Sequence, residues 1–165
     1  MSRCHFPARL ALVSLATGLL FAPSLVAADF KESKDAVKIT ATADKPNAEG
    51  LQTVTIAIDI QQPWHLYANP VRNEDMVGSQ TVVKLSQAGK NLKPEDVKIK
   101  YPAGREVKDP TAGTYWIYEG KVEITAVVQR GKEDTAVLEV AVQLSACDES
   151  KCLLPSNVKL KAEAK

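Results

Sequence analysis

The sequence predicts an all-β fold, an immunoglobulin-like antiparallel β-sandwich, from two kinds of observation. Apolar residues recur at every second position in short segments between Asp35 and Lys165, as in strands that bury one face and expose the other. Turn-forming residues separate these segments at regular intervals, and no segment has a convincing helical period. About seven to nine short strands joined in this way are typical of a two-sheet sandwich.

The predicted strands are clearest where the alternation is longest. Residues 53–60 place every second side chain, from Val54 to Ile60, on one apolar face, and residues 138–144 alternate over a similar length. The disulfide that joins the two sheets of antibody domains has no counterpart here, because the two late cysteines lie too close in sequence. In chain order the alternating segments are 37–40, 53–60, 81–85, 97–101, 122–125, 138–144 and 158–161, separated by breakers at 45–47, 69–70, 88–90, 101–104, 109–110, 119–120 and 130–131.

Residues 1–28 have the layout of a secretory signal peptide. A basic head with two arginines precedes an apolar run over residues 10–22, and small residues lead up to Ala28. Cleavage there leaves one domain, residues 29–165, in the periplasm or another exported location. The alternative is an uncleaved anchor, because the apolar run approaches the ~18 residues that a membrane span needs. No later stretch is apolar enough to span a bilayer, so we expect no membrane span after cleavage.

The charge composition gives no support to a nucleic-acid partner. The chain has 21 Lys and Arg against 20 Asp and Glu, and the basic residues form no stripe. Glycine-rich phosphate-binding loops are also absent from the sequence. The length that remains after signal cleavage is sufficient for one domain with a substantial core. We therefore expect no nucleic acid and no cofactor, and the cysteines become the main candidates for chemistry.

The segment QLSACDESKCLLPS, residues 143–156, holds the two cysteines that remain after signal cleavage, since Cys4 lies in the signal peptide. An even number of cysteines in an exported protein indicates that Cys147 and Cys152 can pair. The charges between them do not decide their reactivity. The lysine of the segment favours a thiolate at Cys152, whereas the Asp-Glu pair opposes a thiolate at Cys147.

We expect the two cysteines to close a β-hairpin. Its arms are residues 138–146 and 153–160, and its loop is residues 148–151. Directly opposed residues have Cα atoms about 4.5–5.5 Å apart, within the roughly 4.4–6.8 Å that a disulfide accepts. A ring this small stabilises a fold by only about 2 kcal/mol, and a hairpin tip is accessible to the thiolate of a partner. Redox work and a structural disulfide both remain open on this reasoning.

A metal site is the third possibility for the cysteine pair. Two thiolates with four residues between them fit the loose end of zinc-ligand spacing. A structural zinc site needs two more ligands, and His65 is the only histidine outside the signal peptide. Met76 is a candidate additional ligand for copper(I), which prefers thiolates and thioethers. Zinc or copper binding is therefore the minor alternative.

Three motifs resemble one bacterial family, in the order in which the family has them. SACDESKCLLP, residues 145–155, resembles a cysteine pair followed by two apolar or aromatic residues and a proline. PWHLYANP, residues 63–70, is similar to a strand with an aromatic residue, a Leu-Tyr or Ile-Tyr pair and an Asn-Pro. Residues 101–128 are similar to a Pro-x-Gly, a variable loop and a Tyr-Glu-Gly leading into a strand. The family is the N-terminal (alpha) domain of the bacterial thiol:disulfide interchange protein DsbD.

The resemblance implies an immunoglobulin-like fold and a periplasmic role in thiol–disulfide exchange, with cytochrome c biogenesis as one associated process. In that family the domain takes electrons from a thioredoxin-like domain of a membrane-bound reductase and passes them to a periplasmic disulfide isomerase or a similar acceptor. By resemblance, Cys147 and Cys152 are the catalytic pair, and Cys152 forms the mixed disulfide with partners. Longer members continue into a membrane section and a thioredoxin-like domain, so we expect the electron donor to be a separate protein.

The family also covers its cysteine pair with a cap loop, which corresponds here to residues 105–115. The best-known members carry an acidic run followed by an aromatic residue in this loop. This chain offers only Asp109, with Tyr115 or Trp116, at the matching positions. These residues are therefore the cap candidates.

Two aromatic clusters each have a functional and a packing interpretation. In the first, Tyr67 or His65 either lies beside the cysteines and tunes them, or packs in the core with a hydrogen-bonded histidine. In the second, the rings either form a partner-docking surface or belong to the core. Strand alternation places at least one member of this second cluster in the core: Tyr115, Trp116 and Tyr118.

Two functional hypotheses follow. The first is an exported thiol–disulfide exchange protein in which Cys152 attacks or is attacked and Cys147 resolves the mixed disulfide. The second is a non-catalytic exported binding or scaffold domain whose disulfide is structural. The second predicts that only a strong reductant opens the disulfide and that opening changes stability alone.

Overall fold

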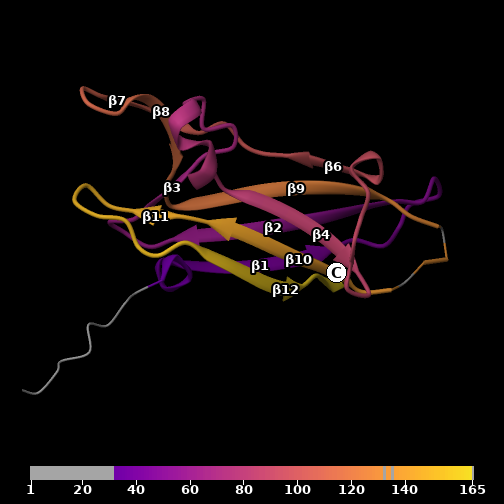
Figure 1. Ribbon diagram of the computed structural model, residues 1–165. Helices are drawn as coiled ribbons and strands as arrows, with labels where there is room; N and C mark the ends of the chain where they lie inside the picture. Colours follow the sequence, from indigo (N-terminus) through magenta and orange to yellow (C-terminus); the bar gives the residue numbers. More distant parts are fainter. Residues whose placement is uncertain (1–31, 132, 135, 165) are drawn as a thin grey trace, which may run out of the picture.

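The computed structural model describes residues 32–131, 133–134 and 136–164, which fold into three β-sheets with short 3-10 helices (Figure 1). Two of the sheets pack face to face as a sandwich, and the third, smaller sheet lies at one end of it. This arrangement confirms the all-β prediction. The predicted signal peptide, residues 1–28, lies outside the described residues.

The larger sheet of the sandwich has the strand order β13-β1-β2-β9-β6. β2 pairs antiparallel with β1 and β9, so that Ile56 lies between Ala41 and Ile124. The apolar face predicted for residues 53–60 is buried along its whole length. Only β13 runs parallel to its described neighbour, β1. The strands are β1 (Val37–Ala43), β2 (Leu51–Ile60), β6 (Val97–Lys100), β9 (Lys121–Gln129) and β13 (Glu163–Ala164).

The second sheet of the sandwich has the order β12-β10-β4-β5 and is antiparallel throughout. Its central strand β10 turns Val140, Val142 and Leu144 toward the core, where they meet the buried side chains of β2 and β9. The period-two pattern of residues 138–144 therefore correctly predicts which face is buried. The strands are β4 (Val82–Gln87), β5 (Lys90–Asn91), β10 (Leu138–Leu144) and β12 (Ser156–Lys161).

The third sheet, in the order β11-β3-β8-β7, is not predicted by the sequence pattern. Two of its strands are too short to show alternation. The segment expected as a cap loop, residues 105–115, instead forms most of the β7–β8 hairpin, which projects from the body of the molecule (Figure 1). Gly104 precedes this hairpin, and a Cβ there would lie 2.7 Å from the Ala68 side chain. The strands are β3 (His65–Tyr67), β7 (Arg105–Asp109), β8 (Gly113–Tyr118) and β11 (Ala146–Cys147).

The helices of the described residues are three short 3-10 turns, in agreement with the lack of helical periodicity in the sequence. None of the helices in residues 32–131, 133–134 and 136–164 is long and apolar enough to cross a membrane. The turns are η1 (Ser33–Ala36), η2 (Glu74–Ser79) and η3 (Pro94–Asp96).

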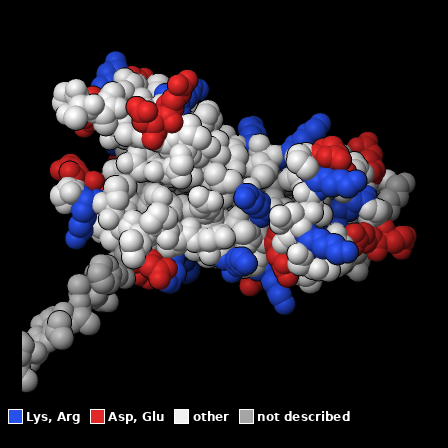
Figure 2. All heavy atoms as spheres, in the orientation of Figure 1, with Lys and Arg blue, Asp and Glu red and all other residues white. Residues whose placement is uncertain are grey.

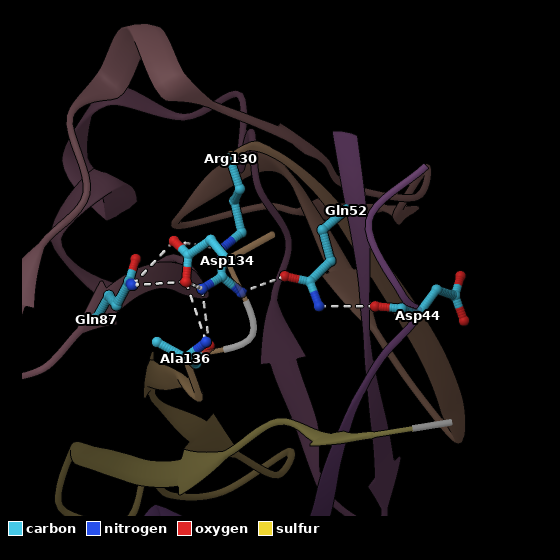
Figure 3. Close-up of polar contacts among 6 residues, drawn as sticks. All are labelled: Asp44, Gln52, Gln87, Arg130, Asp134 and Ala136. Atoms are coloured by element: carbon cyan, nitrogen blue, oxygen red, sulfur yellow. Dashed lines mark hydrogen bonds and ion pairs between the residues drawn. The ribbon is translucent and has the colours of Figure 1, made fainter. Parts of the chain in front are cut away.

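A buried polar cluster ties strands together at the end of the sandwich where β9 leads into β10 (Figure 3). The Arg130 side chain is only 3% exposed, and it pairs with Asp134 at 2.6 Å. It also donates to the Gln52 side chain at 2.5 Å and to the Ala136 carbonyl at 2.8 Å. Gln52 in turn donates to the Asp44 carbonyl at 2.7 Å. We call this region the arginine end; its contacts connect β2 with the β9–β10 connection.

Candidate functional site

The two cysteines face each other at the tip of a hairpin, as the sequence predicts, although their Cα atoms are closer than the predicted distance of about 4.5–5.5 Å. Cys147 and Cys152 form an antiparallel bridge with Cα atoms 4.0 Å apart, and their sulfurs are joined in a disulfide. Directly below the pair, the Leu153 N–H donates to the Ala146 carbonyl at 2.9 Å. The cysteines thus occupy a bridge position at which opposed side chains point to the same face of the hairpin.

The first arm of the hairpin changes sheets just before the disulfide. β10 ends at Leu144, two residues earlier than predicted, because the chain leaves the sandwich at Ser145 and continues as β11 in the third sheet. There β11 pairs with β3, which places Cys147 opposite His65. The disulfide therefore lies at the junction between the sandwich and the third sheet, a region that we call the cysteine end.

The two sulfur-bearing residues differ sharply in exposure. Cys147 is 2% exposed, whereas Cys152 is exposed at the surface. The two residues that follow Cys152 also differ, because Leu153 packs against the core and Leu154 is 53% exposed. An attacking thiolate must approach along the S–S axis of a disulfide. An attacking thiolate can therefore approach the disulfide from the side of Cys152. The exposed apolar side chain of Leu154 lies two residues after this cysteine.

The loop between the cysteines is ordered by one aspartate. The Asp148 carboxylate accepts the N–H groups of Ser150 and Lys151, at 2.7 and 2.8 Å, and the Ser150 hydroxyl at 2.8 Å. The Asp148 N–H closes the loop on the Lys151 carbonyl at 2.9 Å. These donors, with the N–H of Ser150 first, lower the pKa of Asp148 below its ordinary value. The carboxylate is therefore ionised at neutral pH, and its hydrogen bonds go to residues of the same loop.

The N-terminal segment, residues 32–36, fastens the base of the hairpin, and we call it the strap. Ser33 is fully buried; its N–H donates to the Leu154 carbonyl at 2.8 Å, and its hydroxyl accepts the Ala146 N–H at 2.9 Å. One residue thus bonds to both arms. Nothing in the sequence pattern indicates this role, because a serine near the start of a strand is common and its partners lie more than a hundred positions away.

His65 lies beside the disulfide, as one of the two sequence interpretations proposes. It is paired with Cys147 across β3 and β11, while Cys147 is paired with Cys152 on its other side, so the three residues form one row. Opposed side chains of adjacent strands point to the same face. Partial burial lowers the pKa of His65 below its ordinary value of 6.5, with the charge of Glu119 opposing this shift. The imidazole is neutral at pH 7.

A row of aromatic rings leads from His65 toward the β7–β8 hairpin. His65 contacts Tyr67 edge-on with ring centroids 5.9 Å apart, and Tyr67 contacts Tyr115 at 5.9 Å in a tilted arrangement. Burial raises the pKa of Tyr67, so its hydroxyl stays protonated at neutral pH. Of the cap candidates, Tyr115 is the one that these contacts connect to the cysteine end.

The other cap candidates make contacts within the hairpin and its surroundings. The Asp109 carboxylate accepts the N–H groups of Thr111 and Ala112 at 2.8 and 2.7 Å, which lowers its pKa and fixes the hairpin turn. Trp116 lies under the guanidinium of Arg72, 4.9 Å from the ring centroid. These contacts do not join either residue to the cysteines.

The third tyrosine of this region belongs to the core, as strand alternation predicts. Tyr118 is buried, and its hydroxyl donates to the Pro102 carbonyl at 3.0 Å and accepts the Asn69 N–H at 3.1 Å.

A contact that the sequence does not indicate occurs in the aromatic cluster of residues 64–67. There the Lys151 ammonium lies 5.9 Å from the ring centroid of Trp64, which draws the cysteine loop toward the segment before β3.

The described residues give little support to the metal alternative. No group of three or more His, Cys, Asp or Glu side chains in this part of the chain is placed to hold a metal ion. Met76, the proposed copper ligand, lies half-buried in η2. The cysteines themselves are joined in a disulfide, whereas a metal requires thiolates.

Comparison with known proteins now identifies the family. The profile described as "Thiol:disulfide interchange protein DsbD, N-terminal" matches residues 27–164. This chain belongs to the DsbD N-terminal domain family. The match includes the whole cysteine hairpin and the strap beneath it. A search of curated protein sequences gave no match.

Solved structures of DsbD N-terminal domains and a related protein share the fold. The N-terminal periplasmic domain of ScsB from Proteus mirabilis superposes with a TM-score of 0.57 at 19% identity, covering 78% of this chain and 47% of that one. The reduced DsbD N-terminal domain of Neisseria meningitidis gives 0.52 at 13% identity, covering 82% and 90%. The complex between the DsbD and PilB N-terminal domains from the same organism gives 0.50 at 13%, covering 82% and 88%. The immunoglobulin-like sandwich prediction is confirmed, and the chain spans about half of the ScsB structure.

The geometry of this DsbD-type hairpin allows a specific kind of chemistry. A thiolate from outside can reach Cys152, and the leaving sulfur of Cys147 stays within the body of the domain. Lys151 precedes the exposed cysteine and favours negative charge on its sulfur. The arrangement fits thiol–disulfide exchange at one sulfur, with the second sulfur held ready to close the ring again.

Proposed function

We propose that this protein is a periplasmic thiol–disulfide exchange protein that relays electrons from a thioredoxin-like donor to oxidised periplasmic proteins through Cys147 and Cys152. The observation that carries the proposal is the unequal exposure of the two cysteines in one hairpin-tip disulfide. Membership of the DsbD N-terminal domain family supports it. The small ring also favours it over a structural staple, because such a ring contributes only about 2 kcal/mol.

The relay consists of two exchange reactions that balance in electrons and protons. A donor thiolate attacks the Cys152 sulfur, the Cys147–Cys152 bond breaks, and Cys147 leaves as a thiolate that takes a proton from water. The second donor thiol then displaces Cys152, so the donor becomes a disulfide and this protein a dithiol. In the second reaction the Cys152 thiolate attacks the disulfide of an acceptor, and Cys147 releases the reduced acceptor by attacking Cys152.

The donor and acceptor classes follow from the family. The donor is the thioredoxin-like domain of a membrane-bound reductase, and the acceptor is a periplasmic disulfide isomerase or a similar protein. The neighbouring structure of a DsbD N-terminal domain bound to a PilB N-terminal domain supports docking of a partner domain. Figure 2 shows a broad area without charged side chains next to the cysteine hairpin, which suits an interface core.

The aromatic residues of the third sheet have a supporting role in this proposal. Through its contact with Tyr67, Tyr115 keeps the β7–β8 hairpin beside the cysteine end, where the hairpin limits access to the disulfide from the side of the buried Cys147. His65, paired with Cys147, influences the charge on the leaving sulfur. Asp109 and Trp116 act indirectly, by fixing the hairpin turn and its packing.

Single-cysteine variants test the relay with thioredoxin as the probe for the donor class. The thioredoxin probe keeps only its exposed cysteine, activated as a mixed disulfide with thionitrobenzoate. We expect Cys147→Ser to accumulate a mixed disulfide with this probe, because the exposed Cys152 thiolate displaces thionitrobenzoate and neither protein retains a resolving cysteine. We expect Cys152→Ser to form about tenfold less of it, because the remaining sulfur is buried. The proposal fails if the two variants trap thioredoxin equally.

The reduction potential of the wild-type pair separates this proposal from the scaffold alternative. A value between roughly −120 and −270 mV places the pair among exchange proteins, whereas a value below about −300 mV marks a structural disulfide. The measurement is equilibration of the protein against glutathione or dithiothreitol. A potential in the lower range, together with no thioredoxin exchange, would establish the scaffold function instead.

A further inference from the structure

The cysteine hairpin contains an irregularity just below the disulfide. Cys147 is paired with Cys152, whereas Leu144 is paired with Ser156. Two residues therefore separate the paired positions on the first arm and three separate them on the second, so the second arm carries one extra residue, as in a β-bulge. The extra length includes Pro155, which has no N–H to give to a ladder. For this reason β12 begins at Ser156 and not at residue 153 as predicted.

At this irregularity the two arms lack part of their ladder. The Leu153 N–H donates to the Ala146 carbonyl, but the Ala146 N–H turns to the Ser33 hydroxyl instead of back to the second arm. The Leu154 carbonyl likewise accepts its hydrogen bond from the Ser33 N–H. A buried backbone N–H without a partner is costly, so this replacement matters to the hairpin. Ser33 therefore supplies hydrogen-bond partners for the Ala146 N–H and the Leu154 carbonyl, which the bulge leaves without partners on the opposite arm.

The strap is held in place by further contacts with the second arm of the hairpin, so the position of Ser33 is fixed. Glu32 forms a parallel bridge with Leu154, and the Lys34 N–H donates to the Ser156 hydroxyl at 3.0 Å. The Glu32 and Asp35 side chains complete a capping box around η1. Figure 1 shows this indigo turn beside the hairpin arms at the start of β12. The strap therefore bonds to both cysteine arms and holds them at a set separation.

We propose that Ser33 is a positioning residue for the Cys147–Cys152 pair, which favours the disulfide over the dithiol by holding the two arms together in both oxidation states. This inference rests on the proposed exchange function. In the reduced state the hydrogen bonds of the hairpin and its loop keep the two thiols close, and Ser33 contributes one bond to each arm, through its hydroxyl and its N–H. Loosening the arms lowers the effective concentration of one thiol at the other. Disulfide formation then becomes less favourable, and exchange equilibria shift toward the dithiol.

Ser33→Ala removes the hydroxyl acceptor and keeps the N–H that reaches Leu154. In equilibration with glutathione, one glutathione disulfide accepts two electrons and two protons from the dithiol to give two glutathione thiols. We expect the equilibrium constant for closing the protein disulfide to fall about tenfold in Ser33→Ala, which corresponds to about 30 mV toward a more oxidising potential. Ser33→Thr keeps the hydroxyl and is expected to restore most of the equilibrium constant.

Ser156→Ala provides a second variant, because it loosens the strap at Lys34 and leaves the partner of Ala146 in place. We expect a smaller shift in the same direction, so the proposal remains testable even if Ser33→Ala does not fold. Gln52→Met is the matched control: it removes a buried hydrogen-bonding side chain at the arginine end. It should lower stability without changing the glutathione equilibrium.

The outcomes separate the positioning role from the exchange function. If Ser33→Ala and Ser156→Ala lower the unfolding free energy but leave the glutathione equilibrium at the wild-type value, Ser33 is only structural and the inference is overturned. If Gln52→Met shifts the equilibrium as much as Ser33→Ala, the effect is one of stability and the inference is overturned as well. Failure of wild-type protein to exchange with thioredoxin would instead reject the proposed function.

Discussion

The cysteine end and the arginine end of the sandwich each depend on a buried polar side chain that ties separate segments together, but the two side chains differ in charge. At the cysteine end, the neutral hydroxyl and N–H of Ser33 hold the arms of the hairpin. At the arginine end, the guanidinium of Arg130 joins Gln52, Asp134 and the Ala136 carbonyl (Figure 3). Both solve the same problem, which is to satisfy buried polar groups where a strand leaves its sheet.

The difference between the ends corresponds to what each must do. A buried cation next to the cysteines would stabilise a thiolate and lower the pKa of the thiol, so it would shift the balance between disulfide and dithiol in the proposed exchange. A hydroxyl and an amide hold the backbone without adding charge. The arginine end has no such constraint, and there an ion pair with several further hydrogen bonds contributes to stability. We infer that stability and chemistry are assigned to opposite ends of the molecule.

The largest expected effect comes from Arg130→Met. This change removes the partner of the Gln52 side chain and of the Ala136 carbonyl in a site that is almost closed to water. We expect the free energy of unfolding in urea to fall by about 3 kcal/mol, the cost of leaving buried hydrogen-bonding groups unpaired. The reduction potential of the cysteine pair should not change.

Lys98→Met is the matched control for this prediction. Lys98 is an exposed cation in β6 of the same sheet, and its replacement should alter stability by less than about 0.5 kcal/mol. A parallel change of the reduction potential in Arg130→Met would show that the two ends are coupled and would break the comparison.

A moderate effect is expected for Tyr115→Ala at the cysteine end. Loss of the ring that contacts Tyr67 frees the β7–β8 hairpin from the aromatic row. We expect reduction of the disulfide by dithiothreitol to become about threefold faster because access to the sulfurs improves. Thr114→Ala, an exposed neighbour on β8, should leave the rate unchanged. Equal rates for wild type and Tyr115→Ala would remove the shielding role from the hairpin.

The smallest effect concerns His65 and pH. Since burial lowers its folded pKa below the 6.5 of the unfolded chain, the unfolded state binds a proton first as the pH falls through about 6.5. The free energy of unfolding therefore decreases from that pH down to the folded pKa and is constant below it, as far as this group is concerned. His65→Gln should lack this decrease when urea transitions at pH 7.5, 6.5 and 5.5 are compared. If His65→Gln shows the same dependence of the unfolding free energy on pH as wild type, a group other than His65 is responsible for the decrease.

The long strands and the cysteine hairpin can be predicted from the sequence because their signals are local. The apolar face of residues 53–60 and the six-residue segment from Cys147 to Cys152 carry their own geometry. The third sheet cannot be predicted in this way, since β3 and β11 have only three and two residues, too few to repeat an alternation, and depend on pairing with each other. The loop expected for residues 105–115 rests on resemblance to the family's cap loop, and the structure shows a β7–β8 hairpin in most of this segment.

The support of the candidate site is the part that sequence reasoning misses. The sequence around Ser33 contains no motif that marks this residue. Its role depends on hydrogen bonds with Ala146 and Leu154, which lie close to it only in the folded chain. The arginine cluster is similar, because Gln52 and Arg130 lie in separate strands of the pattern with no shared motif. The number and spacing of the cysteines indicate the pair, and the resemblance to a family adds its role, but the residues that hold the pair emerge only from the three-dimensional contacts.

The small size of the disulfide ring has a consequence for the life of the protein in its compartment. Cys147 and Cys152 are five positions apart, and the sheets, the core and the arginine end lie outside the ring that they close. Proteases cut chains that have opened, and the opened population depends on the overall stability. Because the ring adds about 2 kcal/mol, opening the disulfide raises the unfolded population roughly thirtyfold. We therefore expect proteases to remove the reduced protein faster than the oxidised one.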